Sequence, residues 1–87
     1  MKIVVEERPA WRAKTIVGPL QLRRALRQVG WMGDLKTYMT TAPEEIQEAW
    51  EYATEIPRLD PLVLAVQTQF QKTDQEMDQL FELAQTF

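Results

Sequence analysis

The chain is divided at short intervals by residues that start and stop helices. Thr41 and Thr73 each stand three positions before a glutamate, the spacing of a capping box. Pro19 suits the first turn of a helix, and Gly30 is placed to end one. Between these signals, apolar residues recur at helical spacing. The pattern predicts a mainly α protein, a small bundle of four to five short helices in residues 18–87.

The predicted helices are short and joined by short turns, so consecutive helices are expected to pack as neighbours. One of them is expected to extend from its Thr41 cap to Ile56, because Pro57 stops it. The apolar faces of the helices predict the core. Its expected members are Leu22, Leu26, Val29, Ile46, Trp50, Ala53, Leu62, Val66, Phe70, Met77, Leu80 and Phe81.

Residues 1–17 differ in kind from the rest of the chain. Residues 2–6 are short and rich in β-branched side chains, which predicts a strand, and residues 13–17 predict a second one after a turn. A hairpin of two strands is only marginally stable in water. The extended, strand-like N-terminal arm is therefore expected to pack on the helices, to add to the sheet edge of a partner, or to remain mobile.

Trp11 stands between Arg8 and Arg12 in this arm, and two interpretations of it are open. It is either a local staple laid over the helical core or an anchor that fills a pocket on a partner. Tryptophan and arginine are both enriched at binding hot spots. The predicted partner-binding residues are Ile3, Val4, Val5, Trp11 and Arg12.

The net charge of −3 is unevenly distributed along the chain. Residues 1–40 carry eight Lys or Arg against three acids, and residues 41–87 carry two against ten. Three interpretations follow. In the first, the helix that carries Arg23, Arg24 and Arg27 faces the glutamate-rich helix in the same fold. In the second, each half meets an opposite surface in a head-to-tail contact or on a partner. Binding of nucleic acid by the basic half is disfavoured, because the chain lacks a basic stripe and the usual motifs.

Composition narrows the chemistry that the chain can perform. Without cysteine or histidine it cannot form disulfides, cysteine nucleophiles or the usual zinc sites. The carboxylates that remain lie four positions apart along helices and are expected to form solvated faces rather than metal sites. We expect no catalytic residue, no metal and no cofactor, and hence no enzyme. The carboxylates concerned are Glu44, Glu48, Glu51, Glu55, Asp74, Asp78 and Glu82.

The size of the chain favours a partner. A single core in a domain of this length supplies only about 3–5 kcal/mol of net stability. A partner protein or a homo-oligomer is therefore expected. No apolar run approaches the roughly 20 residues of a membrane span, and the N-terminus lacks the pattern of a signal peptide. We therefore expect that the chain does not associate with a membrane and that it is made in the cytoplasm.

Four segments occur in a characteristic order over residues 16–87. They are Q-L-R-R-A-L (residues 21–26), A-W-E-Y-A-T (49–54), R-L-D-P-L-V (58–63) and T-D-Q-E-M-D-Q-L-F-E-L-A (73–84). The ordered set resembles a family of small helical proteins encoded by tailed bacteriophages and prophages, whose genes commonly lie among tail and tail-fibre genes. The chain departs from the family at Gly18-Pro19, where many relatives have a Ser or Thr cap, and in its richer arm.

The resemblance implies a non-enzymatic structural or adaptor protein of the virion. It would be made in the host cytoplasm, belong to the tail, baseplate or tail-fibre region, and dock to a larger tail-fibre or baseplate protein through its N-terminal arm. One alternative is a tail or fibre assembly chaperone that is absent from the mature particle. An alternative of another class is a small DNA-binding regulator.

Overall fold

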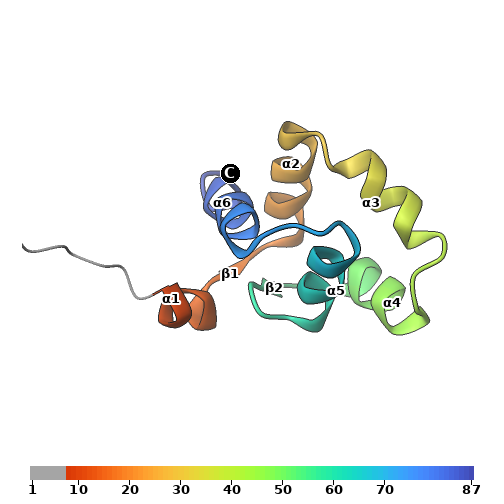
Figure 1. Cartoon of the computed structure of the whole chain (residues 1–87), viewed down its shortest axis with the longest axis horizontal. Helices are drawn as coiled ribbons and strands as arrows, with labels where there is room; N and C mark the ends of the chain where they lie inside the picture. The colour runs from red at the N-terminus through yellow and green to blue at the C-terminus, as the bar shows by residue number, and fades with distance from the viewer. Residues whose placement is uncertain (1–7) are drawn as a thin grey trace, which may run out of the picture.

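The computed structural model describes residues 8–87, which form six helices and one two-stranded sheet (Figure 1). The protein is mainly α, as predicted. Five of these six helices lie within residues 18–87, and the sixth, α1, lies where the sequence predicted an extended arm. The predicted strand at residues 2–6 lies outside the described residues. The elements in chain order are α1 (Arg8–Lys14), β1 (Ile16–Val17), α2 (Pro19–Val29), α3 (Met32–Met39), α4 (Glu44–Tyr52), β2 (Ile56–Pro57), α5 (Pro61–Gln69) and α6 (Asp74–Ala84).

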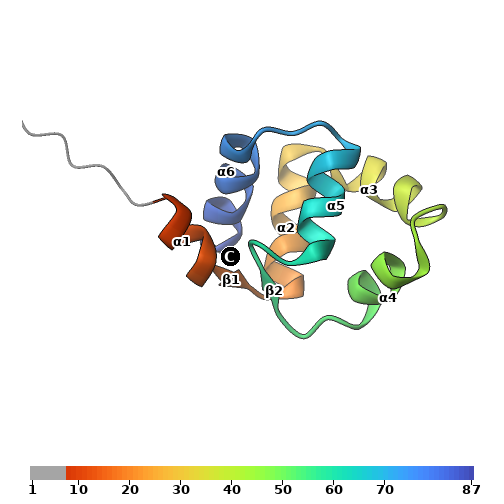
Figure 2. The same cartoon turned by 60° about the horizontal axis from the view of Figure 1, so that its bottom comes forward.

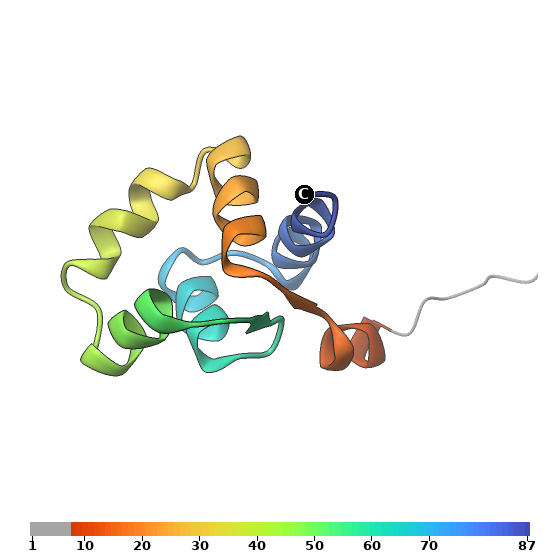
Figure 3. The ribbon, with the colours of Figure 1, turned by 180° about the vertical axis from the view of Figure 1, so that it is seen from behind.

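The helices are arranged around one central pair. Helix α2 packs against α6 more extensively than any other two elements pack together, and α4 packs against α5 (Figure 2). Helix α3 follows α2 and leads to α4 at the end of the molecule that is farthest from α1, as the view from behind also shows (Figure 3). Helix α1 thus lies at the end of the molecule opposite to α3 and α4.

The core lies between these helices and contains seven of the twelve predicted residues. Val29 is 40% exposed, because it is the last residue of α2 and precedes the turn at Gly30. The predicted core residues Ile46, Trp50, Ala53 and Phe70 are only half-buried at the margin of the core. The buried cluster consists of Val17, Leu22, Ala25, Leu26, Met32, Leu35, Ile56, Leu62, Val63, Val66, Met77, Leu80, Phe81 and Ala84.

The segment before β1 is a helix, where the sequence predicted a turn between two strands. Pro9 falls in the first turn of α1, where a missing N–H is tolerated. Alanine, arginine and lysine, which all favour helix, fill most of its other positions. The hydroxyl of Thr15 donates to the carbonyl of Trp11 at the end of the helix. The extended part of the arm is therefore reduced to Ile16 and Val17 within the described residues.

The helix predicted to reach Ile56 ends at Tyr52 instead, and this prediction was wrong. Ile56 lies in β2, where it is 1% exposed and stands opposite Val17 of β1. The backbone at Ala53 has already turned to an extended conformation (φ −62°, ψ 134°). Pairing with β1, which stands far away in the sequence, removes this segment from the helix.

The two predicted capping boxes have different outcomes. At Thr73 the box forms: its hydroxyl oxygen accepts from the Glu76 N–H (3.1 Å), and the Glu76 carboxylate accepts from the Thr73 N–H (2.9 Å). This second bond lowers the pKa of Glu76. At Thr41 the box is absent, because the hydroxyl donates to the carbonyl of Tyr38 in the preceding turn (3.4 Å). Pro43 then occupies the N-cap position of α4.

Two glycines allow a matched test of how backbone conformation affects stability. Gly30 ends α2 with φ +83°, as predicted, whereas Gly33 lies inside α3 with open space where a Cβ would lie. We expect Gly30→Ala to destabilise the fold by about 1–2 kcal/mol, because a side chain is strained in the left-handed region. Gly33→Ala is expected to stabilise it by about 0.4–1 kcal/mol. Urea unfolding of both variants checks this; equal effects of the same sign would contradict it.

Candidate interaction surface

Helix α1 is attached to α6 by two pairs of opposite charges. The Arg12 guanidinium donates from Nε and Nη2 to the Asp78 carboxylate (3.0 and 2.8 Å). The Arg8 guanidinium donates from Nη2 to Glu82 Oε2 (3.2 Å). Both arginines and both acids are spaced four positions apart, and the earlier arginine meets the later acid. The two helices therefore meet in an antiparallel ladder of two rungs.

Asp78 forms the inner rung and lies between two guanidinium groups. On its buried side, Arg58 Nε donates to Asp78 Oδ1 at 2.9 Å, and the side chains of Arg58 and Asp78 are only 1% and 5% exposed. Arg58 Nη2 also donates to the main-chain carbonyl of Asp74 (3.3 Å). The Asp78 carboxylate is thus fixed from inside the body by Arg58 and approached from outside by Arg12.

The charges in this cluster determine the state of Asp78. Burial alone would raise the pKa of Asp78, but hydrogen bonds from Arg12 and Arg58 outweigh that effect, and the net pKa is lowered. The bond to Asp78 also raises the pKa of Arg12 above its ordinary value. The carboxylate of Asp74 lies 3.8–3.9 Å from both guanidiniums and contributes a second negative charge. Asp78 is therefore a carboxylate anion at neutral pH.

The sequence did not indicate this cluster. Asp78 was expected on a solvated acidic ridge with Asp74 and Glu82, but it is 3% exposed, so that expectation was wrong for Asp78. Its direct neighbour Met77 belongs to the core, which places Asp78 at the border of the buried face. The place of Asp78 beside Met77 was the only indication in the sequence that Asp78 is buried. The two arginines that bind it lie far away in the sequence.

The predicted partner-binding residues fall into two groups. Ile3, Val4 and Val5 lie outside the described residues. Trp11 is half-buried and packs against the core, with the Arg8 guanidinium 4.6 Å from its ring centre, as expected of a local staple. Arg12 is engaged by Asp78, so neither described residue of the predicted set is a free anchor in this state.

The outer edge of β1 is open. Ile16 stands opposite Pro57, and the flanking positions carry the ladder bonds, including Arg58 N–H to the Thr15 carbonyl at 2.8 Å. The N–H and C=O of a residue between such bonds point away from the partner strand. Within residues 8–87 no hydrogen bond reaches the Ile16 backbone, and Ile16 is 49% exposed. Pro57 fits β2 because its position requires no N–H.

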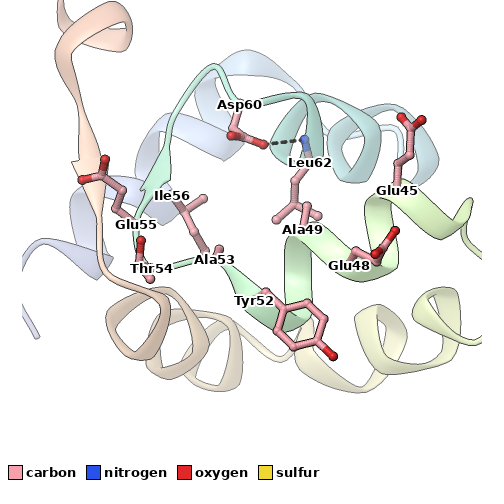
Figure 4. A pocket seen from close by; sticks show the side chains of 10 residues that line it. All are labelled: Glu45, Glu48, Ala49, Tyr52, Ala53, Thr54, Glu55, Ile56, Asp60 and Leu62. Carbon is pink, nitrogen blue, oxygen red and sulfur yellow. Dashed lines mark hydrogen bonds between the residues drawn. The ribbon is translucent and has the colours of Figure 1, made fainter.

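A shallow depression of about 480 Å³ lies between α4, the segment before β2 and the start of α5 (Figure 4). Glu45 and Glu48 project from α4 at one side of it and Glu55 lies at the other, while Tyr52 stands at the end of α4 and is 76% exposed. Asp60 is occupied as a helix cap, because its carboxylate accepts from the Leu62 N–H at 2.9 Å. The carboxylates on this face are therefore spread around the depression.

The basic face of α2 does not pair with these glutamates. Arg23 stacks its guanidinium 4.0 Å from the ring centre of Trp50 in α4 and donates to the Trp50 carbonyl (3.4 Å). Within residues 8–87, Arg23, Arg24 and Arg27 form no ion pair. The predicted complementarity between the two helices is thus realised as one stacking contact rather than as ion pairs.

In the part of the chain that the structure describes, no three acidic side chains converge as a metal site would require. None of the helices in this part is both long and apolar enough to cross a membrane. Comparison of the chain with protein-family models, with curated proteins and with solved structures yields no match.

Proposed function

We propose that this chain is a non-enzymatic adaptor of a tailed phage particle that binds a larger protein of the tail, baseplate or tail-fibre region. The order of the four segments that resemble the phage family supports the phage setting. The open edge of β1 supports the binding role and is the observation that carries it. Residues 1–7, which precede α1 and include Ile3, Val4 and Val5, are assigned to the same partner.

Docking would proceed by strand addition at β1. An extended segment of the partner would hydrogen-bond to the N–H and C=O of Ile16, which supply affinity independently of side chains. The exposed apolar side chain of Ile16, which is 49% exposed, would add specificity. A strand edge that is only two residues long suits a specific partner and limits unspecific pairing.

Quantitative mass spectrometry of purified particles of the encoding phage or prophage tests the assignment to the virion. Presence at a small fixed multiple of the copy number of a known tail protein is the expected result. Absence from particles together with abundance in the producing cells would contradict the adaptor and favour the assembly chaperone. The same preparation serves for the variants of Ile16 that test the docking edge.

Ile16→Pro removes the outward N–H while leaving the bonds between β1 and β2 in place, since these use neighbouring residues. We expect its incorporation into particles to fall at least about tenfold, the effect of losing about 1.4 kcal/mol of binding. The matched control is Ile16→Thr, which keeps the N–H and a β-branched side chain. Normal incorporation of a folded Ile16→Pro chain, as judged by its circular dichroism melt, would exclude docking at this edge.

A further inference from the structure

We propose that the outer face of α6 is a binding site for a helix with two arginines four positions apart, and that α1 fills this site as a removable strap. The face consists of Asp74, Gln75, Asp78, Gln79 and Glu82. Together with Arg8 and Arg12 of α1, most of these residues line a depression of about 290 Å³. The proposal stands independently of the adaptor role and of the β1 edge.

The site is prepared for a guanidinium before α1 is considered. Asp78 is 3% exposed, and its carboxylate is held from the inner side by Arg58 Nε at 2.9 Å. Arg58 is itself 0% exposed and cannot turn outward. The carboxylate therefore presents a fixed edge toward the surface, and Arg12 meets that edge with two of its nitrogens at 2.8–3.1 Å. Bidentate geometry of this kind selects arginine over lysine.

The second rung defines the spacing of the ligand. Glu82 lies one helical turn after Asp78 on α6, and Arg8 lies one turn before Arg12 on α1. Because the helices run antiparallel, both arginines of a helix find a carboxylate at once. Asp74 lies one turn before Asp78, at the start of α6 and 3.9 Å from Arg12, and adds negative charge. The recognised pattern is therefore Arg-x-x-x-Arg in helical conformation.

Departure of the strap removes no fully buried side chain from the body, although it uncovers the Trp11 ring that packs against the core. No residue of α1 is fully buried, and the rung from Arg8 to Glu82 has side chains that are 34% and 45% exposed. If Arg12 departs, Asp78 keeps its bond to Arg58, so no buried carboxylate is left without a cation. The packing of α2 against α6 is the most extensive contact between two elements of the fold and is made directly between them. Helix α1 thus combines a specific charged contact with one half-buried ring, that of Trp11, on the core.

Release of the strap is measured on the full chain with two spin labels. The chain contains no cysteine, so labels at Ala10→Cys in α1 and Gln85→Cys after α6, both exposed positions, report one distance. Wild-type sequence at the other positions is expected to give one narrow distance distribution. In Arg12→Ala, the fraction of molecules with broadly distributed label distances, divided by the fraction with the narrow distance, is expected to rise at least about tenfold. Arg24→Ala, an exposed arginine of α2 with no ion pair in residues 8–87, is the matched control.

Recognition in trans is then tested with a synthetic peptide of residues 8–17. Added to the Arg12→Ala chain, it is expected to shift the amide NMR signals of residues 74–82, and a peptide with alanine at both arginine positions is expected to bind at least about tenfold more weakly. Exchange of α1 between two copies, seen as dimers in sedimentation, would support the same site. A narrow distribution in Arg12→Ala, or a peptide that leaves α6 unperturbed, would overturn the proposal.

Discussion

Replacement of Asp78 by alanine is expected to lower the free energy of unfolding by about 3–5 kcal/mol, the usual effect of removing one partner from a buried ion pair. Arg58 is 0% exposed, and its buried Nη1 has no hydrogen-bond partner in residues 8–87. Once Asp78 is gone, the nearest carboxylate to the Arg58 guanidinium is that of Asp74 at 3.8 Å, which is 64% exposed and a poor substitute. The variant would leave a positive charge in the core.

Urea unfolding of Asp78→Ala and of Glu82→Ala provides the comparison. Glu82 makes the outer rung of the same ladder, but its side chain is 45% exposed, and loss of such a surface ion pair changes stability by only about 0–1 kcal/mol. Equal and small effects of the two substitutions would show that the Asp78 cluster is not held in the core. Replacement of both Arg58 and Asp78 by apolar residues of similar volume is expected to recover much of the loss.

The same cluster predicts a dependence on pH. The pKa of Asp78 is lower in the folded chain than in the unfolded chain, because bonds from Arg12 and Arg58 outweigh burial. Its contribution to stability is therefore complete above the unfolded pKa of about 3.9 and is lost as the pH falls through the lower, folded value. Acid titration of the wild type, followed by circular dichroism, is expected to show this loss, and Asp78→Ala is expected to lack it.

Phe81→Ala is expected to destabilise the fold by about 3–5 kcal/mol through the cavity that it leaves. The ring is 0% exposed and lies among Leu22 and Leu26 of α2 and Val63 of α5. It also lies 5.9 Å from the Arg58 guanidinium, so its loss loosens the cluster next to it. Phe81 therefore connects its own helix, α6, to α2 and α5.

Phe87 serves as the control for Phe81, since it carries the same side chain near the end of the chain and is 41% exposed. Phe87→Ala is expected to change stability by less than about 0.5 kcal/mol, as for most surface substitutions. Thermal unfolding of both variants distinguishes them. A loss below about 1 kcal/mol for Phe81→Ala would mean that the surrounding helices collapse into the space, at the low end of cavity effects.

Local signals predicted local structure well. The Thr73 cap and the left-handed Gly30 depend on residues within one turn, and both are present. Thr41 shows the limit of such signals. It has the same spacing to a glutamate as Thr73, yet the end of α3 engages both its hydroxyl and its N–H at the Tyr38 carbonyl. Competition from a neighbouring element decided between two identical patterns.

Features that join distant parts of the chain were not predicted. Ile56 has the apolar character of a helix face, but its place is determined by Val17, which stands opposite it in β1. Asp78 resembles a solvated acid until Arg58 and Arg12 approach it from other elements. The candidate surface depends on these long-range pairings. Composition distinguished the N-terminal arm from the rest of the chain, but it predicted neither helix α1 within the arm nor the attachment of α1 to α6.

The attachment of the N-terminal segment has a consequence for the order in which the chain is made and folded. Strand β1 pairs with residues 56–57, and α1 is bound by Asp78 and Glu82. Synthesis delivers both partners only after α2, α3 and α4 have left the ribosome, since translation proceeds from the N-terminus. Residues 8–17 are therefore made well before the segments that they bind, and until those segments emerge a nascent chain presents residues 8–17 to whatever else is near.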